Sequence, residues 1–107
     1  MTVVLLFIVQ ISVAQARPQP WLRNWLLRHN HYCLVQIIDH EDGNYDPERV
    51  GGGYGIPQAV PGNKMASAGS NWATNPWTQI RWMIGYVNGK YGGECNAWAY
   101  WQVHSNY

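Results

Sequence analysis

The sequence predicts a single α+β domain that is mostly helical, and three observations lead to this class. Apolar residues recur at three- and four-residue spacing on both sides of a central segment, which is the pattern of amphipathic helices. The central segment, residues 43–62, holds six glycines and three prolines, so it favours turns or a short hairpin over regular helix. The chain has 107 residues and no internal repeat, which is typical of one compact domain.

Two helices are expected before the glycine-rich segment. A lead-in with two prolines is followed by residues at helical spacing. These residues are Trp21, Leu22, Trp25, Leu26 and His29. The same periodicity continues further along and predicts a helix over residues 32–41, which ends before Gly43. Glu41 is therefore expected near the carboxyl end of this helix.

Three more helices are expected after the glycine-rich segment. Residues 63–68 are long enough for one short helix. Asn75 and Pro76 form a helix start, with Asn75 as the cap, and predict a long helix over residues 76–90 that glycines terminate. Residues 94–103 predict a last helix, with Trp98 and Trp101 facing inward.

Composition and charge restrict the partners that the chain can have. Seven Trp and seven Tyr stand against a single Phe, a bias toward rings with a polar edge that suits a wet, ring-lined cleft. The net charge is +1, and the seven Lys and Arg residues are spread singly from Arg17 to Lys90. No basic stripe is present to neutralise a phosphate backbone, so nucleic acid is not an expected partner.

The amino-terminal residues predict export. Residues 1–16 are apolar from Val3 to Val9 and end in small residues before Arg17, the pattern that a signal peptidase recognises. The apolar run is shorter than the ~20 residues of a membrane-spanning helix, so stable membrane insertion is not expected; an ordinary buried helix is the alternative. We expect residues 17–31 to form a lead-in and helix, and residues 32–107 to form the main domain of a secreted monomer.

Two cysteines, Cys33 and Cys95, remain after the predicted cleavage. An even count in an exported chain favours a disulfide over free thiols. Such a bond ties the helix over residues 32–41 to the last helix. Two unpaired, buried cysteines are the alternative.

The acidic residues indicate where chemistry takes place. Five of the six fall within ten positions, between Asp39 and Glu48. Splitting a glycosidic bond requires a proton on the departing oxygen, which a carboxylic acid supplies near neutral pH only in an apolar setting. Glu41 follows an apolar stretch and precedes the glycine-rich loop, so its carboxyl is expected to face a cleft. The alternative is a solvated surface charge at a helix end.

Other reactive side chains lack the partners that catalysis requires. His40 and His104 have no Cys or Asp at metal-ligand spacing, so neither a metal nor another cofactor is expected. No Ser-His-Asp order is visible, and a disulfide at Cys33 removes the remaining candidate nucleophile.

The order and spacing of several motifs resemble the lytic transglycosylase domain of the soluble (SLT) type, which has a lysozyme-like fold. That family has a Glu-Ser at a helix end, a Gly-Leu-Met-Gln loop, an Asn opening the next helix and an Ala-Tyr in the last one. The matching positions here are Glu41, Gly55-Ile56-Pro57-Gln58, Asn75 and Ala99-Tyr100. The chain is most similar to a secreted branch that contains aggregation-promoting-factor-like and resuscitation-promoting-factor-like cell-wall enzymes. The strings GYGIPQAVPGNKMASAG, WATNPWTQIRWMIGYV and CNAWAYW carry this likeness, which covers residues 33–107.

The resemblance implies an enzyme that cleaves the β-1,4 bond between N-acetylmuramic acid and N-acetylglucosamine in peptidoglycan, either at the cell wall or in association with a phage. It implies that Glu41 is the catalytic acid and that no cofactor is needed. It also implies that a set of side chains binds or shapes the glycan site. These are Gln58, Tyr54, Asn75, Tyr86, Trp98 and Tyr100. For Tyr86 and Trp98, core packing is the alternative, because helix-borne aromatic residues with inward periodicity usually belong to a core.

Two departures from the family pattern affect the expected active centre. Asp42 stands where the family has Ser, and the loop over residues 44–53 is shortened. A second carboxylate beside Glu41 either helps the acid stay protonated or misdirects it. Three alternatives therefore stay open. They are a lysozyme-type muramidase that hydrolyses the bond, a non-catalytic peptidoglycan-binding module, and a structural secreted protein held by its disulfide.

Overall fold

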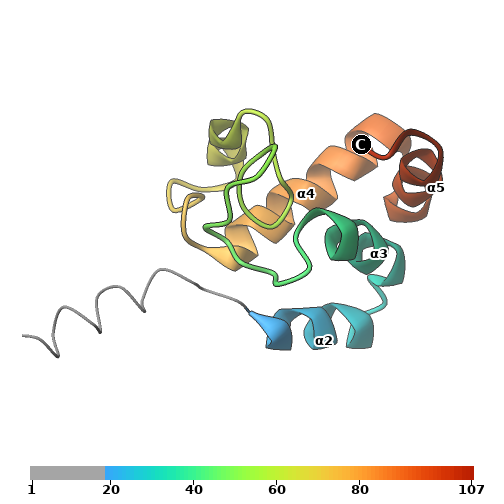
Figure 1. The fold of residues 1–107 in the computed structure, drawn as a ribbon, viewed down its shortest axis with the longest axis horizontal. Helices are drawn as coiled ribbons and strands as arrows, with labels where there is room; N and C mark the ends of the chain where they lie inside the picture. The colour runs from blue at the N-terminus through green and yellow to red at the C-terminus, as the bar shows by residue number, and fades with distance from the viewer. Residues whose placement is uncertain (1–18) are drawn as a thin grey trace, which may run out of the picture.

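A computed structural model describes residues 19–107 and shows an all-helical arrangement in this part of the chain (Figure 1). Its elements are α2 (Pro20–Arg28), α3 (Tyr32–Glu41), the 3₁₀ helix η1 (Gly62–Ala68), α4 (Pro76–Tyr91) and α5 (Glu94–His104). Each expected helix is present. The boundaries of α3 agree with the sequence prediction, and those of η1, α4 and α5 differ from it by one residue at one end.

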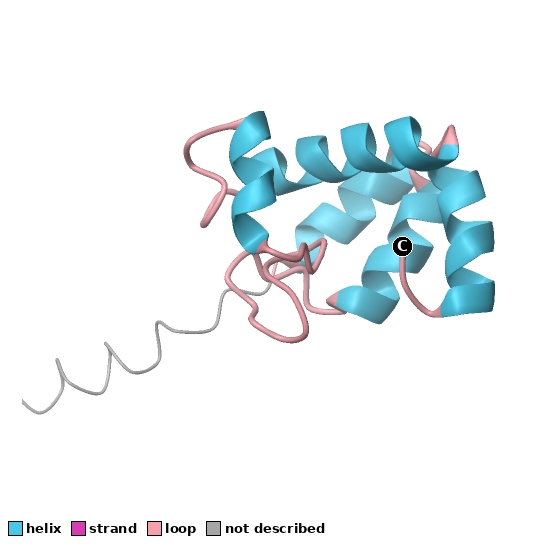
Figure 2. Cartoon of the chain, turned by 90° about the horizontal axis from the view of Figure 1, so that it is seen from above, coloured by secondary structure: helices cyan, strands magenta, loops and turns pink. Residues whose placement is uncertain are grey.

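The long helix α4 organises the molecule. It contacts η1 and α5, while α3 contacts both α2 and α5. Figures 1 and 2 show α4 passing through the structure, with α5 at its carboxyl end and η1 with the irregular loops at its amino end. The glycine-rich loop therefore lies between the end of α3 and the start of α4.

Local chemistry fixes both ends of α4. The Asn75 side-chain oxygen accepts a hydrogen bond from the backbone N–H of Thr78 at 3.0 Å, and Pro76 occupies the first helical position. At the other end Gly92 adopts a left-handed conformation with φ of 80°, which glycine reaches without strain. The predicted capping role of Asn75 is confirmed.

The apolar core lies where α2, α3, α4 and α5 meet. Its fully buried residues come from all four helices and from the loop before η1. They include Leu22, Leu26, Leu34, Ile37, Ile38, Ile56, Met83, Val87 and Ala97. Full burial of a Leu, Ile or Met side chain contributes roughly 1.5–3 kcal/mol, so this cluster supplies the main stabilising force. The three- and four-residue spacing seen in the sequence corresponds to these inward faces.

A disulfide joins Cys33 on α3 to Cys95 on α5, as the sequence predicts. The Cα atoms are 5.0 Å apart and the two residues are separated by 62 positions in the chain. Beside it, His31 Nδ1 lies 2.8 Å from a carboxylate oxygen of Glu94. The acid-bearing helix and the last helix are therefore held together both covalently and by a polar contact.

The β part of the predicted α+β class is wrong for the described residues, which contain no strand. The glycine-rich loop forms only two isolated antiparallel bridges, and Tyr54 takes part in both, with Val50 and with Ala59. Left-handed backbone at Gly55 and Gln58 reverses the chain after a few residues. The bridges therefore do not extend into a ladder of paired strands, and the described part of the chain is all-helical.

Gln79, a buried residue of α4, holds this loop in place. Its side-chain oxygen accepts from the backbone N–H of Ile56 at 2.9 Å. Its amide nitrogen donates to the carbonyls of Pro47 and Trp72, each at 2.7 Å. One amide thus satisfies three backbone groups in segments that have no regular secondary structure to satisfy them.

Replacing Gln79 by Leu is expected to lower the free energy of unfolding by about 3 kcal/mol, because it leaves buried backbone groups without partners. Urea unfolding followed by far-UV circular dichroism measures the change. Gln102→Leu, at an exposed position on α5, is the matched control and should leave the midpoint unchanged. Equal midpoints for the two variants would contradict the role given to Gln79.

The predicted signal peptide, residues 1–16, lies outside the described residues. Between residues 19 and 107, no helix combines the length and the apolar character that crossing a membrane requires.

Candidate active site

Glu41 is the last residue of α3, and its side chain is partly buried. The indole N–H of Trp101, on α5, donates a hydrogen bond to Glu41 Oε2 at 3.0 Å. The Trp101 ring is itself packed against His40 and Trp98, with ring centroids 4.5 and 5.6 Å away. The carboxylate is thus anchored from a second helix, which the disulfide holds next to its own.

Glu41 lines a hollow of about 240 Å³ between the glycine-rich loop and the carboxyl-terminal residues. Its other lining residues are Gly52, Gly53, Gln58, Val60, Ser105, Asn106 and Tyr107. An added Cβ at Gly53 would lie 2.1 Å from the carbonyl oxygen of Gln58. This close passage of two backbone segments explains a glycine at position 53, in the wall of the hollow.

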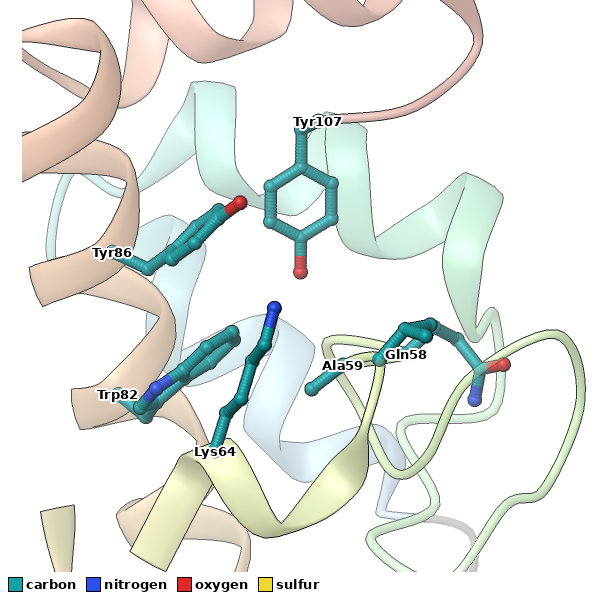
Figure 3. A pocket seen from close by; sticks show the side chains of 7 residues that line it. Gln58, Ala59, Lys64, Trp82, Tyr86 and Tyr107 are labelled. Atoms are coloured by element: carbon teal, nitrogen blue, oxygen red, sulfur yellow. The ribbon is translucent and has the colours of Figure 1, made fainter. Parts of the chain in front are cut away.

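A second hollow of about 180 Å³ lies beside the first and shares lining residues with it (Figure 3). Its lining residues are Gln58, Ala59, Val60, Lys64, Trp82, Tyr86 and Tyr107. Three residues line both hollows, namely Gln58, Val60 and Tyr107. We call the two hollows together the groove. Glu41 lies at one end of it, and the aromatic side chains of α4 lie at the other.

Tyr107 lies between the two ends of the groove. Its hydroxyl donates a short hydrogen bond to the carbonyl of Pro57, and Figure 3 shows this hydroxyl pointing into the second hollow. Its ring meets Tyr86 edge to face, with centroids 5.8 Å apart. Burial, and then the nearby negative charge of Glu41, raise the pKa of Tyr107 well above its ordinary value, so the hydroxyl stays a neutral donor.

Three other acids of the cluster have structural partners. Asp39 accepts hydrogen bonds from the Arg23 guanidinium at 2.9–3.2 Å and from the Tyr45 hydroxyl at 2.9 Å. Asp42 and Asp46 accept from backbone N–H groups of their own turns. Among the described residues that line the groove, Glu41 has the only carboxylate side chain.

The Asp42 side chain is buried, with 1% exposure, and caps the turn that follows α3. Its two oxygens accept from the backbone N–H groups of Asn44 at 3.3 Å and Asp46 at 2.8 Å. Burial raises the pKa of Asp42 to about 6, although these two hydrogen bonds oppose the shift. Asp42 therefore stabilises the turn that follows α3.

The raised pKa of Asp42 predicts a pH dependence of stability. The folded chain keeps a proton on Asp42 between its ordinary pKa of 3.8 and about 6, where the unfolded chain has lost it. The free energy of unfolding should therefore fall as the pH rises through this window. Urea midpoints at half-unit pH steps measure this slope. It should be weaker in Asp42→Asn and kept in Glu48→Gln, which changes an acid further along the loop; an equal slope in all three proteins would contradict the assignment.

The loop residues expected to bind sugar have clear structural partners. The Gln58 amide donates to the carbonyls of Arg49 and Gly55 and accepts from the N–H of Gly53, and it points away from the second hollow (Figure 3). Gln58 contributes to the groove wall while its side-chain amide organises the loop. Its predicted hydrogen bond to sugar stays a prediction.

The expected neighbour of Glu41 in the loop, Tyr54, has its partners elsewhere. Its ring meets Trp72 edge to face at 5.5 Å, and its hydroxyl donates to the carbonyl of Ala73 at 2.6 Å. Burial and the charges of nearby acids raise the pKa of Tyr54. Tyr54 therefore braces the loop against the segment that leads to α4, where Asn75 caps the helix.

The three aromatic residues expected on the last two helices of the site have three different positions. Tyr86 lines the groove and stacks on Trp82 with ring centroids 4.9 Å apart. Trp98 stacks on Trp101, the residue that donates a hydrogen bond to Glu41. Tyr100 stacks on His104 at 3.8 Å, outside the residues that line the groove.

Four residues of the site were not assigned to it from the sequence. Trp101 was expected to face inward, without a link to Glu41, while Lys64, Trp82 and Tyr107 were given no role. The four-residue spacing of Trp82 and Tyr86 is a signal for a shared helix face. No comparable signal exists for Tyr107, because its contact with Pro57 joins residues 50 positions apart.

Within residues 19–107, no cluster of three or more His, Cys, Asp or Glu side chains is placed to hold a metal ion. Comparisons with protein-family profiles, with curated proteins and with solved structures give no match for this chain. A function is therefore inferred from the groove and its residues.

Proposed function

We propose that this protein cleaves the glycan strands of peptidoglycan as a lytic transglycosylase with a lysozyme-like fold, and that Glu41 is its catalytic acid. The observation that carries the proposal is a groove with one carboxylate at one end and an aromatic wall at the other. Aromatic rings and a few placed polar groups are typical of saccharide sites, and a single acid suffices when the substrate supplies the nucleophile.

In the first step, protonated Glu41 donates its proton to the departing glycosidic oxygen as the bond to the anomeric carbon breaks. The Trp101 indole N–H donates to Oε2 and fixes the carboxyl group in place. Trp101 acts here as a positioning residue. Within the described part of the chain, Oε1 has no hydrogen-bond partner, so it is the oxygen available to the substrate.

The second step distinguishes transglycosylation from hydrolysis. A retaining hydrolase needs a second carboxylate ~5–5.5 Å from the acid, and an inverting one needs a base at ~6.5–9.5 Å. The groove lining contains no second carboxylate side chain among the described residues, and Asp42 accepts hydrogen bonds from its own turn. This favours attack by the 6-hydroxyl of muramic acid on its own anomeric carbon. Deprotonated Glu41 takes the hydroxyl proton, and a 1,6-anhydro ring closes without consuming water.

The product tests this proposal. Purified peptidoglycan is incubated with the mature domain, and the released muropeptides are analysed by mass spectrometry. Fragments ending in anhydro-muramic acid, lighter by one water than those that a lysozyme releases, are expected. Reducing ends alone would instead point to a muramidase with Asp46 as the missing carboxylate, which Asp46→Asn then tests. Binding without cleavage would indicate a non-catalytic peptidoglycan-binding module.

The disulfide supports a location outside the cytoplasm, because such bonds persist in oxidising compartments. We propose that the protein is secreted and acts at a cell wall or in association with a phage, as a monomer that needs no cofactor.

A further inference from the structure

The end of the groove farther from Glu41 combines a cation with an aromatic wall. Lys64, on η1, is exposed and lines the second hollow together with the stacked rings of Trp82 and Tyr86. Figure 3 shows its ammonium group pointing into the space bounded by these rings and by Tyr107. Within the described residues, this ammonium group has no hydrogen-bond or ion-pair partner, and no carboxylate side chain lines this hollow.

The other lysine of the chain is engaged differently. The Lys90 ammonium donates to the Tyr86 hydroxyl at 3.1 Å and lies over the rings of Tyr86 and Tyr91, at 5.4 and 5.3 Å from their centroids. Lys90 thus helps to fix the Tyr86 ring, and it is not among the residues that line the hollow. Of the two lysines, Lys64 is the one whose ammonium group faces the hollow without a carboxylate side chain beside it.

We propose that this end of the groove binds a sugar unit that carries a carboxylate, with the ring against Trp82 and Tyr86 and the carboxylate at Lys64. The inference rests on the proposed function and adds a basis for selecting muramic-acid-containing glycan over neutral glycan. A lysine ammonium is a compact point charge on a flexible stem, which suits a carboxylate on a mobile side group. In peptidoglycan this carboxylate belongs either to the lactyl group of peptide-free muramic acid or to the stem peptide attached to it.

Binding is measured by isothermal titration calorimetry on Glu41→Gln protein, so that the ligand is not consumed. Three tetrasaccharides are compared: chitotetraose, which is neutral, the peptide-free N-acetylglucosamine–N-acetylmuramic acid tetramer, and the same tetramer with stem peptides. Lys64→Met, Lys64→Arg and Arg28→Met are each made in the Glu41→Gln background. Arg28→Met removes one positive charge at an exposed position on α2, outside the groove, and is the matched control.

Lys64→Met should weaken binding of a carboxylate-bearing tetramer about two- to fivefold, leave chitotetraose unchanged, and lose its effect at high salt, because the lost contact is a solvent-exposed ion pair. Lys64→Arg should restore binding, and Arg28→Met should have no effect. An effect confined to the peptide-free tetramer identifies the lactyl carboxylate as the ligand, and one confined to the peptide-bearing tetramer identifies the stem peptide.

Equal affinities of the Glu41→Gln protein for all three saccharides, unchanged by Lys64→Met, would overturn the inference while leaving glycan binding intact. Failure to bind any saccharide would overturn both this inference and the proposed function.

Discussion

Glu41→Gln is expected to lower the rate of peptidoglycan cleavage by a factor of about 10² to 10⁴, which is the usual contribution of a general acid. The amide has no proton to give to the departing oxygen and cannot take the 6-hydroxyl proton afterwards. Its oxygen still accepts the hydrogen bond from Trp101, so the geometry of the site should persist. Release of soluble muropeptides from purified cell walls measures the rate.

Two comparisons make the Glu41 result specific. Thermal unfolding of Glu41→Gln should match that of the unaltered protein, which separates lost chemistry from lost structure. Glu48→Gln changes an acid of the same type in the neighbouring loop, away from the groove lining, and should retain activity. A folded Glu41→Gln protein that cleaves peptidoglycan at the original rate would exclude Glu41 as the acid.

The second large effect concerns stability. Replacing Cys33 and Cys95 together by Ala is expected to lower the free energy of unfolding by about 4 kcal/mol, since the bond closes a loop of 62 positions and restricts the unfolded chain. Domains of this size have a total stability of ~5–10 kcal/mol, so a large fraction of it would be lost. The midpoint of urea unfolding, recorded for both proteins without reductant, measures the difference.

Cleavage should decline with stability in the double variant, because α3 carries Glu41 and α5 carries the Trp101 that positions it. The unaltered protein treated with a thiol reductant is the companion measurement and should unfold at the same urea concentration as the double variant. If full reduction, verified by thiol titration, left the midpoint unchanged, the stabilising role of the bond would be disproved.

Local signals were sufficient to predict the helices. The inward spacing of Leu34, Ile37 and Ile38 predicted α3, and Asn75 with Pro76 predicted the start of α4. Capping, proline geometry and apolar periodicity all act within one or two turns of a helix, so their effect is visible in sequence. The position of Glu41 at the end of α3 was predicted for the same reason.

The loop and the groove depend on contacts between distant segments, and sequence spacing carries little information about these. Turns or a short hairpin were expected in the loop, and the structure has only isolated bridges there, in a backbone that Gln79 of α4 binds from 23 positions after Ile56. The same kind of contact directed the Gln58 amide into its own loop. Propensity gave no indication of either outcome, because each depends on which buried backbone groups remain to be satisfied.

The sequence by itself thus determined the helices, the disulfide partners and the acid at the end of α3. Only the tertiary structure decided what surrounds that acid. It brought the indole N–H of Trp101 to Glu41, 60 positions away in the chain. It directed the Asp42 side chain toward the backbone N–H of Asp46, and it placed Tyr107 beside Pro57, between the two ends of the groove. The physical reason is that a helix forms from interactions between near neighbours, whereas a groove forms from packing between segments far apart in the chain, where burial and hydrogen-bond satisfaction decide the arrangement.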